Sequence, residues 1–159
     1  MLARKSVRLA VIALAAALAL VLLLYPTDEK RVRAAAEALL AGANEGGLTL
    51  SAALEQHTVE HVVVTVAELP APLEGRPALI GAVQRARALD PRLRFRAQAM
   101  DVTVQGKTAR VNADLVVGLP QASIAPRHAV AMFEKRDGAF RLVSAEIGAT
   151  RRDEPEERP

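Results

Sequence analysis

An unbroken apolar run from Leu9 to Tyr25 is the feature that most constrains this chain. As a helix at ~1.5 Å per residue, the run would rise about 25 Å, close to the ~30 Å hydrocarbon layer of a bilayer. Three basic residues precede it and Pro26 ends it. The pattern predicts a basic leader and transmembrane anchor in residues 1–26, with residues 9–25 in contact with membrane lipid.

A cleavable signal peptide is the alternative interpretation, because it also has a basic leader and an apolar stretch. Its cleavage site needs small residues at the end of that stretch, whereas here the end is Leu22-Leu23-Leu24-Tyr25-Pro26. We therefore favour an uncleaved, single-pass anchor in the inner (cytoplasmic) membrane. A short basic leader usually stays inside, so we expect the domain on the periplasmic side, although basic residues also follow the run.

Charge and cysteine content exclude several classes of function. The net charge of +3 and the pI near 9.8 suggest a basic protein. However, three basic residues precede the apolar run and every acidic residue follows it, so the domain is formally neutral. Nucleic-acid binding needs a concentrated basic face, and we expect no such partner. The absence of cysteine from the sequence excludes disulfides, thiolate metal sites and thiol nucleophiles.

Helical periodicity predicts three helices after the anchor. Thr27, followed by two carboxylates, is typical of a helix start, and we expect this helix to end in the glycine-rich stretch that begins at Gly42. A second helix is expected around residues 49–57. The third should begin after Gly75, with Pro77 in its first turn, where a missing N–H does no harm.

Strand patterns dominate the rest of the domain. A β-branched valine run predicts a first strand over residues 60–67. From Leu93 the apolar residues alternate, but the parity changes near Ala99, which predicts a β-bulge. Turns at residues 106–107 and 137–138 would form two hairpins whose registers keep one face apolar.

The final hairpin predicts a second apolar face on the sheet. With a turn at Asp137-Gly138, Phe133 faces Leu142. Three short helices can cover only one face of a sheet, so we expect the other face to be buried in a homodimer. The large apolar residues that alternation places opposite Phe133 are Val130, Met132, Val143 and Ile147.

The order of these elements resembles the nuclear transport factor two-like superfamily, which includes ketosteroid isomerases and SnoaL-like polyketide cyclases. The segment Leu73-Glu74-Gly75-Arg76-Pro77-Ala78-Leu79-Ile80 is similar to the G-R-x-A-[LI] start of the third helix in that family. The resemblance covers about residues 28–148. It implies an α+β fold in which three helices pack on a curved antiparallel sheet, with a ligand cone between the two layers. The tyrosine-based oxyanion donor of the isomerases has no counterpart, because the only tyrosine is Tyr25 in the anchor.

The chain therefore divides into three parts. Residues 1–26 form the anchor, residues 27–149 form the α+β cone domain, and residues 150–159 form a charged tail. We expect the tail to be disordered, because it has two prolines and nothing to bury.

One sequence match suggests zinc chemistry. His57-Thr58-Val59-Glu60-His61 fits the H-x-x-E-H pattern of zinc peptidases, which needs one continuous helix so that both imidazoles point the same way. Thr58 and Val59 lead directly into the valine-rich strand. We therefore expect the two histidines on different elements, and we predict no metal and no cofactor.

Other ionisable residues are candidates for ligand contact or catalysis. His61 stands early on the first strand, whose concave face would line the cone, and we expect His128 near it on a later strand. Asp101 or Asp114 could act as a general base if it faced an apolar cone.

Each of these candidates also has an interpretation without a functional role. A histidine on a half-buried strand more often has a structural role. In the predicted hairpin register Asp101 opposes Asn112, which indicates a solvated strand surface. An anion site and a solvated sheet edge explain the basic strand residues equally well. These residues are Arg94, Arg96 and Arg127.

Two functions remain open. The sequence favours a non-catalytic, membrane-tethered binding or assembly module, similar in layout to periplasmic subunits of secretion and transport machines, with a protein of a membrane complex as partner. The alternative is an isomerase- or cyclase-like enzyme that acts on a small apolar substrate, with His61 or Asp101 as base.

Deletion of residues 1–26 should give a soluble, folded domain, because it removes the membrane-length apolar run and leaves a charge-balanced remainder. Fractionation of washed membranes measures this. A truncated protein that stays with the membrane would contradict the anchor.

Overall fold

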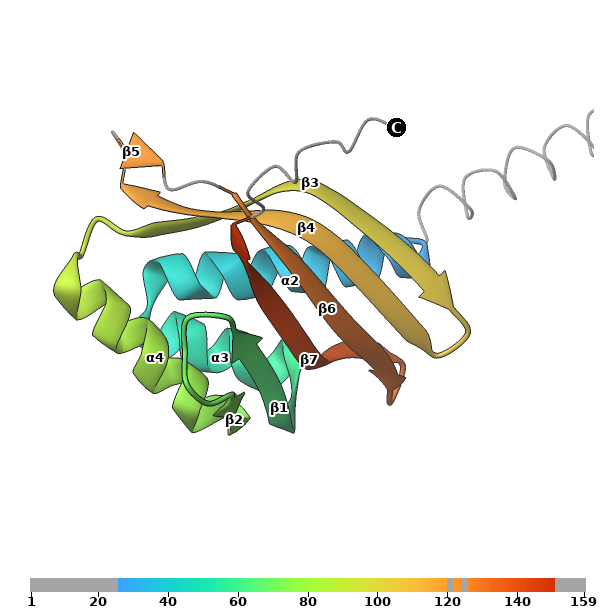
Figure 1. Cartoon of the computed structure of the whole chain (residues 1–159). Helices are drawn as coiled ribbons and strands as arrows, with labels where there is room; N and C mark the ends of the chain where they lie inside the picture. Colours follow the sequence, from blue (N-terminus) through green and yellow to red (C-terminus); the bar gives the residue numbers. More distant parts are fainter. Residues whose placement is uncertain (1–25, 120–121, 124–125, 151–159) are drawn as a thin grey trace, which may run out of the picture.

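The computed structural model describes residues 26–119, 122–123 and 126–150 (Figure 1). Within these ranges no helix is long and apolar enough to cross a membrane. The expected anchor, and the tail from residue 151 onward, lie outside the described residues. The elements are α2 (Asp28–Glu45), α3 (Gly47–His57), β1 (Thr58–Val66), β2 (Leu73–Glu74), α4 (Gly75–Leu89), β3 (Arg94–Gln105), β4 (Thr108–Leu119), β5 (Ala122–Ser123), β6 (Arg127–Arg136) and β7 (Ala139–Thr150).

Helix α2 begins at the predicted cap and ends at Glu45, within the predicted glycine-rich stretch. The Thr27 hydroxyl oxygen accepts a hydrogen bond from the backbone N–H of Lys30 at 3.4 Å and so caps the helix. Gly42 is buried within α2, and a Cβ there would lie only 2.9 Å from the Cβ of Ala53. This glycine therefore allows α2 and α3 to pack closely, and the turn itself comes at Gly46, where φ is +73°.

The sheet is mixed, which corrects the expectation of an antiparallel sheet. The strand order is β2-β1-β7-β6-β4-β3, with β5 paired to β4. Strands β1 and β7 run parallel, whereas the other pairs are antiparallel. Alternation within a strand shows which face is buried but not which strand lies beside it. The two hairpins are local, while the pairing of β1 with β7 joins opposite ends of the domain.

Both hairpin registers are confirmed. Val104 pairs with Ala109, and Phe133 pairs with Leu142. The bulge near Ala99 is also confirmed, because Ala99 and Met100 both lie opposite Ala113 and Ala99 has a φ of +48°.

All three helices cover one face of the curved sheet (Figure 1). The expected α+β arrangement of three helices on a curved sheet is thereby confirmed. The core is apolar, and Val32, Val62 and Phe133 are its largest fully buried hydrophobic side chains. The buried members of the core cluster are Val32, Ala35, Val62, Val64, Ala109, Val111, Phe133, Phe140 and Leu142.

A further bulge, in β7, corrects the predicted grouping of apolar residues on the two faces of the last hairpin, and the burial of Phe133 identifies its face as the inner one. Met132 pairs with Ser144 while the adjacent Phe133 pairs with Leu142, so Val143 is the extra residue. The parity change turns Ile147 toward the core, against which it packs. Met132, at 37% exposure, remains on the outer face.

Replacement of Ala99 by glycine should raise the free energy of unfolding by about 0.5–1 kcal/mol, because an alanine at positive φ is strained and a glycine is not. Ala97→Gly, in the regular part of the same strand, should lower it by a similar amount. Urea denaturation measures both variants. Destabilisation by Ala99→Gly would argue against the bulge geometry.

Candidate binding site

The H-x-x-E-H match crosses an element boundary, as predicted. His57 is the last residue of α3, whereas His61 lies within β1. Burial, together with the nearby positive charge of Arg141, lowers the pKa of His57 below its usual value. Within the described part of the chain, no group of three His, Cys, Asp or Glu residues is placed to hold a metal ion.

The ionisable candidates lie on the face of the sheet that the helices leave uncovered. Asp101 pairs with Asn112 as predicted, and its flanking residues Met100 and Val102 pack against the core. Because side chains alternate along a strand, Asp101 points away from the cone. Asp114 lies on the same outer face and is half-exposed.

The two histidines on strands are not brought together. His61 is exposed near the start of β1. His128 is exposed at the other end of the sheet, where its Nδ1 lies 3.7 Å from Oδ1 of Asp114. It is level with the end of β1, because Val66 pairs with Ile147 and Ile147 pairs with Ala129.

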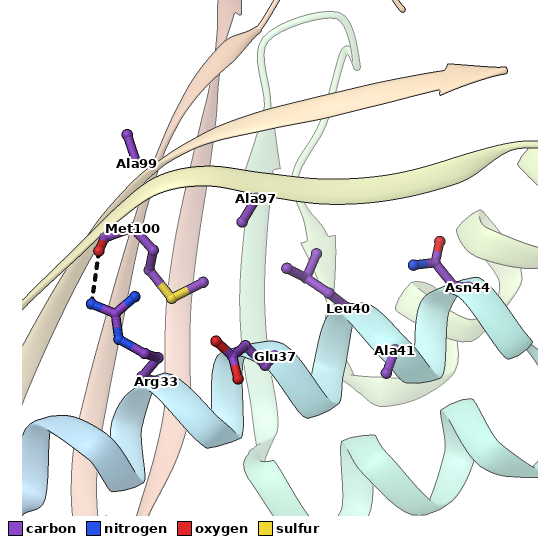
Figure 2. Close-up of a pocket in the computed structure, with 8 residues that line it drawn as sticks. All are labelled: Arg33, Glu37, Leu40, Ala41, Asn44, Ala97, Ala99 and Met100. Carbon is purple, nitrogen blue, oxygen red and sulfur yellow. Dashed lines mark hydrogen bonds between the residues drawn. The ribbon is translucent and has the colours of Figure 1, made fainter. Parts of the chain in front are cut away.

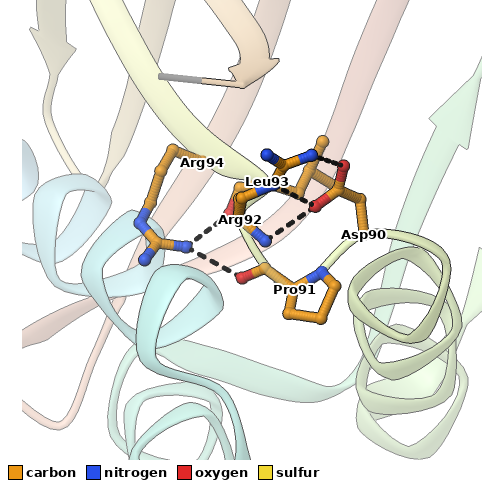
Figure 3. A network of polar contacts seen from close by, with 5 residues as sticks. All are labelled: Asp90, Pro91, Arg92, Leu93 and Arg94. Atoms are coloured by element: carbon orange, nitrogen blue, oxygen red, sulfur yellow. Dashed lines mark hydrogen bonds and ion pairs between the residues drawn. The ribbon is translucent and has the colours of Figure 1, made fainter. Parts of the chain in front are cut away.

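The three arginines considered as an anion site do not form one cluster. Arg94 and Arg96 lie two residues apart on β3, whereas Arg127 lies at the start of β6. Arg94 donates hydrogen bonds to the carbonyl oxygens of Pro91 and Leu93 (Figure 3). Beside it, Arg92 donates to Asp90 through its side chain and its backbone N–H, which lowers the pKa of that carboxyl group. Arg127 pairs instead with Glu68.

An apolar inner cavity of about 130 Å³ lies between α2 and the sheet. It corresponds to the cone expected from the resemblance. Among the described residues that line it, none can ionise and none offers a polar side-chain atom for hydrogen bonding. They are Ala36, Leu39, Leu40, Ala97, Met100, Val111, Ala113, Leu115, Ala129, Ala131, Phe133 and Leu142.

A larger groove of about 440 Å³ lies between α2 and β3, and we call it the α2–β3 groove (Figure 2). Leu40, Ala97 and Met100 line both the groove and the inner cavity. Unlike the inner cavity, the groove is also lined by polar side chains of α2. Figure 2 shows Glu37 between Arg33 and Leu40. The complete lining is Arg33, Glu37, Leu40, Ala41, Asn44, Ala97, Ala99 and Met100.

Hydrogen bonds from α2 to β3 hold the groove at both ends. Arg33 Nη2 donates to the carbonyl oxygen of Met100 at 2.8 Å. Asn44 Nδ2 donates to the carbonyl oxygen of Phe95 at 2.8 Å, and its Oδ1 accepts from the backbone N–H of Phe95 at 2.7 Å. The walls are therefore fixed by bonds to backbone atoms that ordinary substitutions in β3 would not remove.

Sequence reasoning missed the polar residues of this groove. Arg33, Glu37, Leu40 and Asn44 recur at helical spacing, which was a sufficient signal that they share one face of α2. Spacing within α2 could not show that β3 is the strand that lies against this face.

The Gly75-Arg76 pair has a structural role. Gly75 has a φ of +78°, and it places Arg76 in the first turn of α4. The Arg76 guanidinium donates to Oγ1 and to the carbonyl oxygen of Thr58, at 3.1 and 2.7 Å. Thr58 is fully buried at the junction of α3 and β1, and its hydroxyl donates to the carbonyl oxygen of Leu54. Arg76 thus fixes this junction to α4.

No protein-family model and no curated protein matches the chain. Solved structures do match. A nuclear transport factor two-like protein with a cystatin-like fold from Novosphingobium aromaticivorans is 24% identical, with a TM-score of 0.68, and the match covers 85% of this chain and 86% of that one. A nuclear transport factor two-like protein of unknown function from Pseudomonas putida is 13% identical, with a TM-score of 0.65 and coverage of 76% and 85%.

These likenesses support the resemblance at the level of the fold. A third structure, of a protein from the nuclear transport factor two-like family in Streptomyces avermitilis, is 19% identical to this chain. Its TM-score is 0.61, and the match covers 78% of this chain and 97% of that one. The domain therefore has the nuclear transport factor two-like fold. Identities below 25% carry no activity from these proteins to this chain.

Replacement of Arg76 by methionine should lower the free energy of unfolding by about 1–3 kcal/mol, because it removes charge-assisted hydrogen bonds to the buried Thr58. Arg85→Met, at an exposed position of the same helix, should change it by less than about 0.5 kcal/mol. Denaturant midpoints measure both. Equal effects in the two variants would contradict the role of Arg76 in fixing this junction to α4.

Proposed function

We propose that this chain is a non-catalytic binding or assembly module, tethered through residues 9–25 to the inner membrane with its domain on the periplasmic side. The chemistry of the inner cavity carries the proposal. A general acid or base must lie within hydrogen-bond reach of the reacting atoms. The described residues that line the cavity are all apolar.

The positions of the candidate bases favour binding over catalysis. An isomerase- or cyclase-like enzyme would need a carboxylate or an imidazole in the inner cavity itself. The carboxylate of Glu37 lies in the adjoining groove, at an exposed position of α2. Asp101 and His61 are exposed, and Asp101 lies on the opposite face of the sheet. Thr58 is the buried polar residue of the described chain, and its hydroxyl is already engaged by Leu54 and Arg76.

The outer face of the sheet is the surface through which the module would assemble. Met132 is exposed there, and Val63 and Val130 lie on the same face, half-buried. Charged residues of both signs follow Met132 on the same face of β6, where Glu134 and Arg136 form an ion pair at 2.8 Å. A face with an apolar centre and mixed charges can complement a second copy of itself, so a homodimer is the assembly we propose.

Met132→Glu should weaken self-association of the domain that begins at Thr27 by at least about tenfold, because burial of such a side chain contributes about 1.5–3 kcal/mol and the mutation places a charge in the contact. Sedimentation equilibrium measures the dimer constant.

Leu89→Glu provides the matched control. Leu89 is 89% exposed at the end of α4, on the helical side of the domain, so this variant should associate like the wild type. A wild-type domain that stays monomeric at high concentration would overturn the homodimer.

A further inference from the structure

The α2–β3 groove and the inner cavity together have the form of a site for an amphipathic molecule. Leu40, Ala97 and Met100 belong to both, so the two spaces adjoin. The inner space is lined by apolar side chains, and the outer one adds the charged side chains of Arg33 and Glu37. A ligand that filled both would place its apolar part inside and its polar head in the groove.

The size of the inner cavity limits the apolar part. An engineered apolar cavity of about 150 Å³ in another protein stays free of water and takes up benzene. At about 130 Å³, with a similar lining, this cavity suits a group of roughly that size. Met100 is a flexible thioether that can adjust between the two spaces as a ligand enters.

The two charges of the groove limit the head group. Arg33 and Glu37 lie one helical turn apart on α2, and both are exposed. An anionic head would be attracted by the guanidinium but repelled by the carboxylate, and a cationic head would meet the reverse. A neutral head that both accepts and donates hydrogen bonds can satisfy Arg33 and Glu37 at once.

We propose that the groove and cavity bind a small neutral amphiphile with a ring-sized apolar body and a hydroxyl or amide head. Arg33 donates to the head and Glu37 accepts from it. The proposal rests on the proposed binding role of the domain, and it adds the class of ligand and the residues that select it.

Three probes that differ only in their head group test the charge balance. Equilibrium dialysis of the full chain, with its solubilising medium alone as the blank, gives affinities for 3-phenylpropan-1-ol, 3-phenylpropanoate and 3-phenylpropylammonium. The alcohol should bind about three- to tenfold more tightly than either ion. A preference for either ion over the alcohol would overturn the proposal.

Two single-charge variants should shift this preference in opposite directions. Glu37→Gln should raise affinity for the carboxylate probe about three- to tenfold, and Arg33→Gln should do the same for the ammonium probe. Both positions are exposed, so both variants should fold. Arg96→Gln, on β3 outside the groove, should leave the order of the probes unchanged. Equal shifts in all three variants would show that the groove does not hold the head group.

Filling the cavity tests the position of the apolar body. Ala131→Leu adds bulk to the inner cavity and should weaken all three probes by at least about tenfold. If that variant does not fold, Ala129→Val, at the same lining, replaces it. Unchanged binding would overturn the site. A chain that dimerises but binds no probe contradicts only this inference, whereas a monomer that binds the alcohol contradicts only the proposed assembly.

Discussion

The packing of α2 against the covered face of the sheet is the contact on which the rest of the molecule depends. Val32 on the helix and Val62 and Phe133 on the sheet are almost completely buried, and each such side chain contributes roughly 1.5–3 kcal/mol. Polar contacts at the two ends of α2 fix its orientation on the sheet. Lys135 Nζ lies 3.0 Å from the Asp28 carboxylate at one end of α2, and Asn44 bonds to the backbone of β3 at the other. The helix is thereby held along its length, with the cavity beneath it.

Two of the register shifts in the sheet decide which side chains of β3 and of the last hairpin face the helices. The bulge at Ala99 changes which residues of β3 face α2, so that Ala97 and Met100 both line the inner cavity although three positions separate them. The bulge at Val143 turns Ile147 inward and leaves Met132 on the outer face. The bulge at Ala99 therefore shapes the helix-covered side of the sheet, and the bulge at Val143 reduces the apolar area on its outer side.

The candidate site was the part least accessible to sequence reasoning. Histidines and aspartates attract attention because their chemistry is versatile, yet Asp101 occupies an outward position of its strand and His128 is exposed. Arg33 and Glu37, the charged residues that line the groove, were not among the candidates drawn from the sequence. Helical spacing places them on one face, but their role depends on which strand lies opposite.

The sequence by itself determined the local structure of this protein. Capping at Thr27, the turns at residues 106–107 and 137–138, the hairpin registers and the bulge at Ala99 all depend on neighbouring residues and on alternation, and all were predicted. Only the tertiary structure decided that β1 runs parallel to β7, that the parity of β7 changes at Val143, and that α2 and β3 enclose a groove. The physical reason is that these features follow from contacts between segments far apart in the chain. Periodicity within one segment constrains its own buried face but not the partner that buries it.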